Sequence, residues 1–153
     1  MATLASQHLF TLSIDVHPTI GLGATPAGDR WIFPVSGGAF QGERLTGDVL
    51  PLGGADYLLG RADGSFQQDV RLLLRASDGD LIAMTYRGIR TCTEEVADRI
   101  AAGAPVGADE YYLRTAPFFE TASPAYGWLN GIVTVGIGTR RPGGVSYELF
   151  EIL

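Results

Sequence analysis

Apolar and polar residues alternate along much of the chain with the period of two that is typical of half-buried β-strands. Segments with this pattern, or with short β-rich apolar runs, are separated by clusters of Gly, Pro, Asp and Ser that favour turns. The predicted strands are His8–Val16, Asp29–Val35, Ala39–Leu50, Asp56–Gly60, Ser65–Ala76, Leu81–Arg90, Tyr111–Glu120, Leu129–Thr139 and Val145–Leu153.

Some of these segments contain residues that disturb a regular strand. Pro34 indicates an edge or a bulge, and Pro117 interrupts Tyr111–Glu120. Gly42 and Gly47 break the Ala39–Leu50 segment and indicate bulges or sharp coiling. The glycine-rich segment Gly21–Gly28 is predicted to be a loop.

One segment, Thr93–Ala102, has a helical pattern instead. Thr93 is a suitable N-cap, and acidic residues in the first turn suit the helix dipole. Gly103 can end the helix in the left-handed conformation. Because the apolar stripe is narrow, we expect this single helix to lie on the surface of the domain.

These elements predict an all-β fold. Many short strands with Gly-rich connections indicate an antiparallel barrel or a sandwich, and Asp78-Gly79 is a favoured hairpin turn between two of the strands. A chain of 153 residues fits one domain, here residues 1–153, with its own core. Hydrophobic residues at 46% and charged residues at 18% argue against disorder.

The charge pattern restricts the class of partner. The net charge is −6 and the 11 basic residues form no stripe, which argues against a nucleic acid or an anionic membrane surface as partner. The N-terminus lacks the charged and apolar regions of a signal peptide, and a single cysteine excludes an internal disulfide. We therefore expect a cytoplasmic protein.

Several kinds of chemistry lack their sequence signatures. The chain has no lysine and no phosphate-binding glycine motif, and its two histidines, His8 and His17, show no metal-ligand spacing. Cys92 has no histidine nearby in the sequence to serve as its base, so a structural thiol is favoured. No cofactor and no metal are predicted.

The carboxylates are the stronger candidates for chemistry. Asp69 lies in an apolar strand two residues before Arg71, and Asp56 opens another strand. A carboxylate inside a barrel must be paired or solvated, so Asp69 is either half of a structural ion pair or a pocket acid or base. Its side of the strand also carries two arginines and faces either solvent or the barrel interior.

If these carboxylates are catalytic, other side chains complete a candidate site. Arg71 or Arg87 would stabilise a developing oxyanion. Aromatic residues would shape a substrate pocket, although core packing is the commoner role of such residues. The candidate substrate-binding residues are Tyr86, Arg87, Tyr126, Trp128 and Phe40.

The order of short motifs along the chain resembles a bacterial and fungal family known as domain of unknown function 3237. The matching segments are Gly37–Gly42, Leu45–Gly47, Gly53–Asp56, Ala62–Gly64, Asp69–Arg71, Asp78-Gly79, Tyr112–Arg114, Phe118–Thr121 and Tyr126–Asn130. The resemblance implies a closed, lipocalin-like β-barrel that often forms oligomers, and it implies little about activity. Tyr57 departs from the tryptophan expected there, which would reshape a cavity wall if the position faced inward.

Three functions remain open. The first is a cofactor-independent isomerase, lyase, cyclase or hydrolase that uses carboxylate acid–base chemistry on a small hydrophobic or aromatic molecule. The second is a non-catalytic binding protein for a hydrophobic metabolite, and the third is a structural, oligomeric barrel without ligand. The cavity discriminates between them: a carboxylate with a raised pKa favours the first, a purely apolar cavity the second, and a filled barrel the third.

Self-association is also expected. The segment Leu129–Thr139 is apolar on both faces, whereas a strand of an isolated barrel should have one polar face. Its outer face is therefore predicted to contact another copy of the chain in a homo-oligomer.

Overall fold

Ten strands and one α-helix make up the protein, and its computed structural model describes residues 1–153. Two short 3-10 helices, η1 (Ala108–Glu110) and η2 (Gly127–Gly131), precede β8 and β9. The other elements are β1 (Ser6–Val16), β2 (Ile20–Thr25), β3 (Gly28–Gln41), β4 (Thr46–Val49), β5 (Ala55–Gly60), β6 (Phe66–Ala76), β7 (Leu81–Cys92), α1 (Glu94–Ala101), β8 (Tyr111–Glu120), β9 (Thr134–Arg141) and β10 (Gly144–Ile152).

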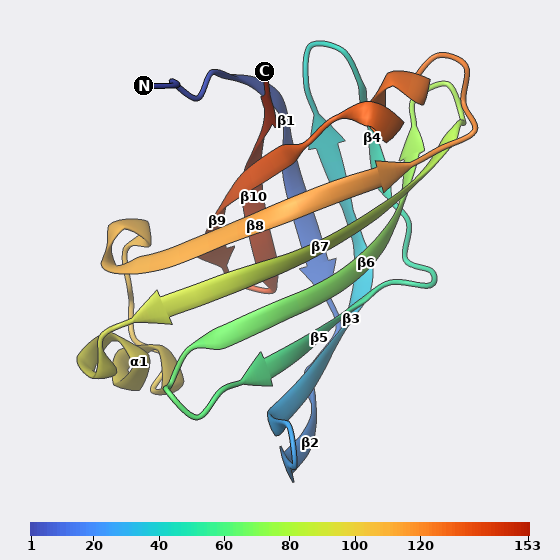
Figure 1. Cartoon of the computed structure of the whole chain (residues 1–153). Helices are drawn as coiled ribbons and strands as arrows, with labels where there is room; N and C mark the ends of the chain where they lie inside the picture. The colour runs from blue at the N-terminus through green and yellow to red at the C-terminus, as the bar shows by residue number, and fades with distance from the viewer.

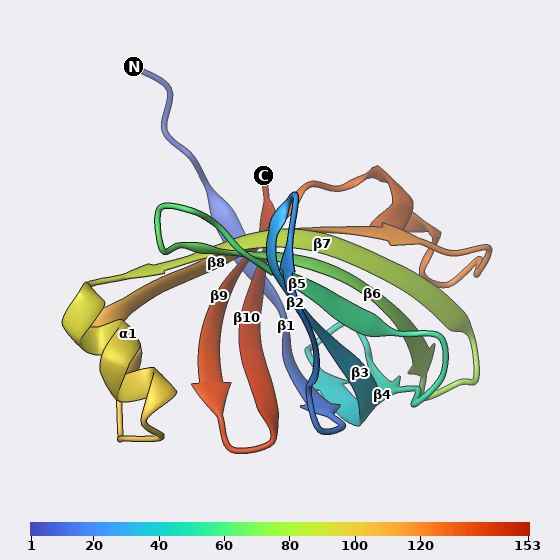
Figure 2. The same ribbon diagram turned by 90° about the horizontal axis from the view of Figure 1, so that it is seen from below.

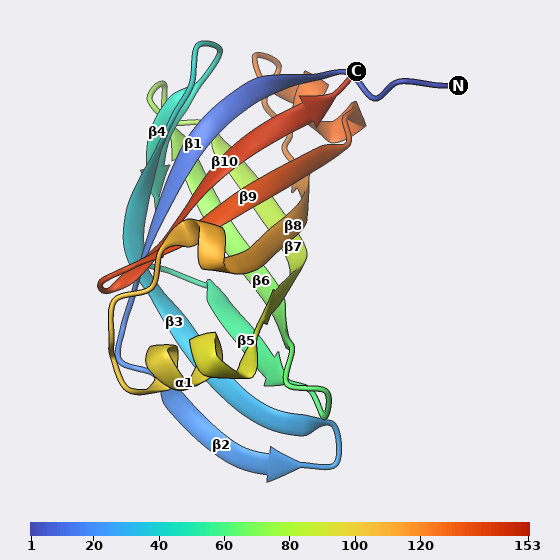
Figure 3. The same cartoon turned by 90° about the vertical axis from the view of Figure 1, so that its left-hand side faces the viewer.

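All strand pairs are antiparallel, and the sheet closes because β1 pairs with β10 on one side and with β3 on the other. The result is an eight-stranded barrel with two additional strands. β4 and β5 share the place between β3 and β6, while β2 pairs only with β3 and projects beyond the barrel (Figure 1). Figure 3 shows β1, β10 and β9 on the near side and β5 to β8 behind them.

The predicted antiparallel barrel with one surface helix is confirmed. Thr93 caps α1 by accepting a hydrogen bond from the backbone N–H of Val96, and Val96 is the one buried residue of the helix. Seen from below, α1 lies at one side of the barrel (Figure 2). No helix of the protein has the length and apolar character needed to cross a membrane.

Some predicted boundaries are wrong. The expected loop at 21–28 contains the edge strand β2, which tolerates its glycines because it is exposed and bulged between Gly21 and Gly23. The two strands expected over 29–50 are one long strand, β3, followed by the short β4. β8 continues through Pro117, because the two registered β8–β9 pairs involve only Arg114 and Thr115, so that the missing N–H breaks no pair there.

The two halves of the barrel interior differ. In the half where β3 and β8 end, Phe10 contacts Phe40 and Phe119 at centroid distances of 5.2 and 5.9 Å, and all three rings are buried. Leu74, Ile82 and Met84 fill the remaining space, and Leu129 of η2 covers this end. This half is a packed apolar core, called the dry core below, and it stabilises the barrel.

The outer face of β9 is apolar, as the sequence suggested. Val135 and Ile137 are 39% and 42% exposed, and the neighbouring Val133 and Phe118 are 55% and 54% exposed. The inward positions of the strand are the small residues Thr134, Gly136 and Gly138. The apolar side chains of β9 therefore point to solvent.

Self-association through this face remains a prediction. We expect light scattering at micromolar concentration to report an oligomer, and Val135→Glu/Ile137→Glu to shift it to monomers, because buried glutamates disrupt an apolar interface. Thr139→Glu, on the outer face of the same strand, is the matched control and should leave the oligomer intact. A monomeric wild-type protein would contradict the prediction.

Candidate functional site

A cavity of about 530 Å³ occupies the other half of the barrel, where β7 ends and β8 begins. Its mouth lies between the β1–β2 connection and the β9–β10 turn, because His17, Thr19 and Gly143 line it. The apolar part of the wall comes from several strands and includes Ile14, Leu58, Val70, Leu113 and Val145. The polar part includes Asp56, Gln68, Tyr86, Arg90, Arg140 and Tyr147.

Strand register places these polar groups in layers. Asp56 pairs with Val70, which in turn pairs with Tyr86, so that the three side chains point inward at one level. One level nearer the mouth, Gln68 lies opposite Gly88. The next inward position of β7 is Arg90, which lies between Phe66 and Leu113.

Asp56 is the carboxylate of the cavity. Its Oδ1 accepts a hydrogen bond of 3.1 Å from the backbone N–H of Asp69, and no salt bridge neutralises it. Burial raises the pKa of Asp56 to about 7, despite the opposing effects of this hydrogen bond and of the Arg90 and Arg30 charges. A carboxyl with this pKa exchanges its proton near neutral pH.

Two buried tyrosines face the same space. The rings of Tyr86 and Tyr147 meet edge to face at a centroid distance of 5.3 Å. Burial raises the pKa of both phenols, and the neighbouring tyrosine and Asp56 raise that of Tyr86 further. Both phenols therefore stay protonated and can act as hydrogen-bond donors, which suits a developing oxyanion.

Glycines opposite Tyr147 make room for its ring. A Cβ on Gly138, its cross-strand partner, would lie 2.7 Å from Cε1 of Tyr147 and 2.6 Å from Cγ of Leu113. A Cβ on Gly136 would overlap Oγ1 of Thr115 and lie 2.7 Å from Cδ2 of Leu149. The small inward residues of β9 are thus required by the aromatic wall of the cavity.

The structure divides the sequence-predicted site residues. Asp56 and Tyr86 line the cavity. Asp69, Arg71 and Arg87 lie exposed on the outer face, so of the two alternatives for the Asp69 strand the solvent-facing one applies. The remaining three lie outside the cavity: Phe40 is buried in the dry core, and Tyr126 and Trp128 pack against it at η2.

One further expectation depends on side-chain direction. Tyr57 is 50% exposed on the outer face, so its departure from tryptophan does not reshape the cavity wall. No group of three or more His, Cys, Asp or Glu side chains is arranged to hold a metal ion.

Sequence reasoning did not assign Gln68, Arg90, Arg140 or Tyr147 to the site. A usable signal was present, because Gln68 shares the inward face of β6 with Val70, Leu72 and Leu74. Arg90 likewise continues the inward face of Ile82, Met84 and Tyr86. A polar residue on an otherwise apolar face indicates a cavity better than a polar residue on the polar face does.

The chain is similar to other proteins of unknown function. The model of the family described as "Protein of unknown function (DUF3237)" matches residues 4–152. A UPF0311 protein of Clostridium acetobutylicum is 33% identical over 147 residues, covering 95% of this chain and 92% of the relative.

Solved structures give the same picture. The crystal structure of a beta-barrel like protein from Acinetobacter baumannii has a TM-score of 0.86 and 34% identity, covering 100% of this chain and 98% of the other. An enzyme from Penicillium herquei has a TM-score of 0.75 and 22% identity, covering 100% of this chain and 97% of the other. At that identity the second likeness shows a shared fold.

The raised pKa of Asp56 predicts a pH-dependent gain in stability for Asp56→Asn. In the folded protein the Asp56 carboxyl stays protonated to a higher pH than in the unfolded chain, where its pKa is near 3.8. The free energy of unfolding therefore falls as the pH rises from about 4 to about 7. The amide avoids that loss and keeps the acceptor for the Asp69 N–H. We expect urea denaturation to show that the gain in the free energy of unfolding is about 2–3 kcal/mol larger at pH 8 than at pH 5.

Asp69→Asn is the control for this experiment. Its exposed side chain predicts a stability change below about 0.5 kcal/mol at either pH. Equal destabilisation by Asp56→Asn at both pH values would contradict the burial of a titrating carboxyl.

The packing around Tyr147 predicts that Gly138→Ala destabilises the protein by about 1–3 kcal/mol, because a methyl group there collides with Leu113 and Tyr147. Gly131→Ala is the matched control: its Cβ would meet nothing within 4 Å, and its φ is not positive. Denaturant midpoints measure both variants, and equal midpoints would refute the close packing.

Proposed function

The chain belongs to the DUF3237 family of proteins of unknown function, and from its cavity we propose that it is a cofactor-independent enzyme that moves a proton on a small, mostly apolar molecule. The observation that carries this proposal is the Asp56 carboxyl, which lies half-buried in the wall of a cavity, where desolvation raises its pKa to about 7. A structural barrel has no need of such a group, and a purely apolar binder has no use for one. One protein with this fold, from Penicillium herquei, is an enzyme.

In the proposed reaction the Asp56 carboxylate removes a proton from a C–H or O–H group of the substrate and becomes a carboxylic acid. The electron pair stays on the substrate, where it forms an oxyanion or closes a new bond. The phenol O–H groups of Tyr86 and Tyr147, which line the same cavity, stabilise the oxyanion. Asp56 then returns the proton to another atom, as in an isomerisation, an elimination or a cyclisation.

A probe reaction tests this base without knowledge of the natural substrate. In the Kemp elimination of nitrobenzisoxazole, a base removes the ring C–H proton, the N–O bond breaks and a coloured cyanophenolate forms without any cofactor. The probe is small, neutral and apolar, so it matches the wall of the cavity. We expect the protein to accelerate the reaction, with a rate that rises with pH and levels off above about pH 7.

The variants assign the base. Asp56→Asn is expected to lower the rate about 100-fold, because a well-placed general base contributes a factor of that order. Asp69→Asn, on the outer face, should keep the full rate above pH 7, while the midpoint of the pH profile moves down because the Asp69 charge helps to raise the pKa of Asp56. If Asp56→Asn keeps the rate, the base is another group, such as the His17 imidazole that also lines the cavity, and the proposal is wrong.

A further inference from the structure

Three arginines lie at the mouth of the cavity, and only one has an acidic partner. Nη2 of Arg141 lies 2.5 Å from Oδ1 of Asp15 and also donates to the backbone oxygen of Ile14. Arg90 and Arg140 form no salt bridge, and neither guanidinium donates a hydrogen bond within the protein. Arg90 is half-buried and Arg140 is exposed, so the cavity mouth presents two cations that no acidic side chain pairs with.

Arg90 is the more deeply placed of the two. Its Cζ stacks 4.4 Å above the ring of Phe66, and its Nε is buried without a hydrogen-bond partner. Burial and the nearby Arg140 charge both lower the pKa of Arg90, so the arrangement costs free energy in the free protein. The stacking fixes the plane of the guanidinium and leaves its N–H edges free for an acceptor.

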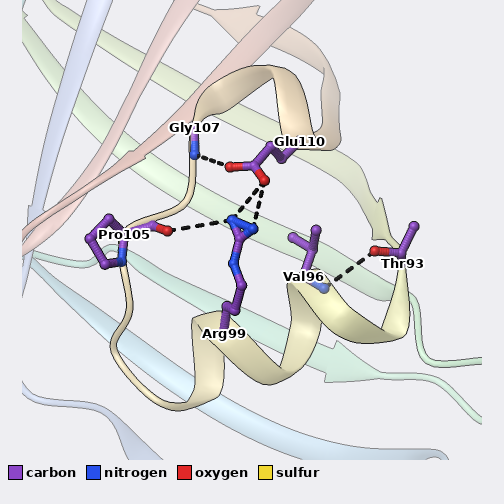
Figure 4. A network of polar contacts seen from close by, with 6 residues as sticks. All are labelled: Thr93, Val96, Arg99, Pro105, Gly107 and Glu110. Atoms are coloured by element: carbon purple, nitrogen blue, oxygen red, sulfur yellow. Dashed lines mark hydrogen bonds and ion pairs between the residues drawn. The ribbon is translucent and has the colours of Figure 1, made fainter.

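Arg140 is held in place by its backbone. Its N–H donates a hydrogen bond of 2.8 Å to Oη of Tyr111, the first residue of β8. The segment before Tyr111 is itself fixed, since Arg99 binds Oε1 of Glu110 at 2.6 and 2.7 Å and the Gly107 N–H donates to Oε2 at 2.7 Å (Figure 4). These hydrogen bonds fix the backbone of the strand end that carries Arg140.

We propose that Arg90 and Arg140 bind a carboxylate of the substrate, and that the substrate is an organic acid whose carboxylate docks at the mouth while its apolar body enters the barrel. This assignment rests on the proposed function, since it names the class of molecule on which Asp56 acts. A carboxylate supplies the acceptors that both guanidinium groups lack. Val70, Leu58 and Leu113 line the cavity and offer the body an apolar wall.

The pair naphthoate and naphthamide tests this inference, because the two molecules share one apolar body and differ in charge. Calorimetry at about pH 6, where Asp56 is protonated, avoids repulsion between two carboxylates. We expect naphthoate to bind at least about 10-fold more tightly than naphthamide, which corresponds to about 1.4 kcal/mol.

Substitutions of the two arginines test where the carboxylate of naphthoate binds. Arg90→Met and Arg140→Met should each reduce the affinity for naphthoate and leave that for naphthamide nearly unchanged. Arg87→Met is the control, because it removes a positive charge from the outer face of the same strand as Arg90. Equal binding of the two probes, or an equal loss in Arg87→Met, would overturn the assignment.

The two proposals fail separately. If the Kemp elimination depends on Asp56 but naphthoate shows no preference, the base stands and the substrate class is wrong. If naphthoate binding depends on the two arginines but Asp56→Asn keeps the elimination rate, the anion site stands and the acid–base role is wrong.

Discussion

Closure of the sheet is the constraint on which the rest of the structure depends. Once β1 pairs with both β10 and β3, every second side chain of the barrel strands must point into one enclosed volume. The chain fills half of that volume with rings such as Phe10 and Phe40 and leaves the other half hollow. Glycines at inward positions of β9 then become necessary, because the ring of Tyr147 occupies the space that a side chain would need.

The hollow half places polar groups where they are costly. Asp56 is kept from full ionisation by burial, and Arg90 is partly desolvated beside another cation. Neither Asp56 nor Arg90 has a salt-bridge partner. Charged groups that destabilise the empty protein are characteristic of functional sites, where interactions with a ligand or a transition state offset the cost of burying them. The dry core at the opposite end stabilises the barrel against this cost.

The sequence predicted the barrel and its helix because these follow from local rules: alternation, turn residues and the Thr93 cap. It also predicted Asp56 and Tyr86 as site candidates, and both line the cavity. Asp69 and Arg71 were preferred for their charge, yet their neighbours Val70 and Leu72 take the inward direction. Arg140 could not have been assigned to the site from its local sequence. It lies near Arg90 only because the barrel brings β7 and β9 together, and these strands do not pair with each other.

The proposed acid–base role depends on an Asp56 carboxyl that titrates near neutral pH inside the barrel. An NMR titration that follows the carboxyl carbon of each aspartate tests it directly, with Asp56 assigned by comparison with the Asp56→Asn protein. We expect one aspartate with a midpoint at about pH 7, and this titration should be absent from the variant. A midpoint for Asp56 near its ordinary value of 3.8 would contradict the account, because the cavity would then hold a permanently ionised carboxylate that accepts protons weakly.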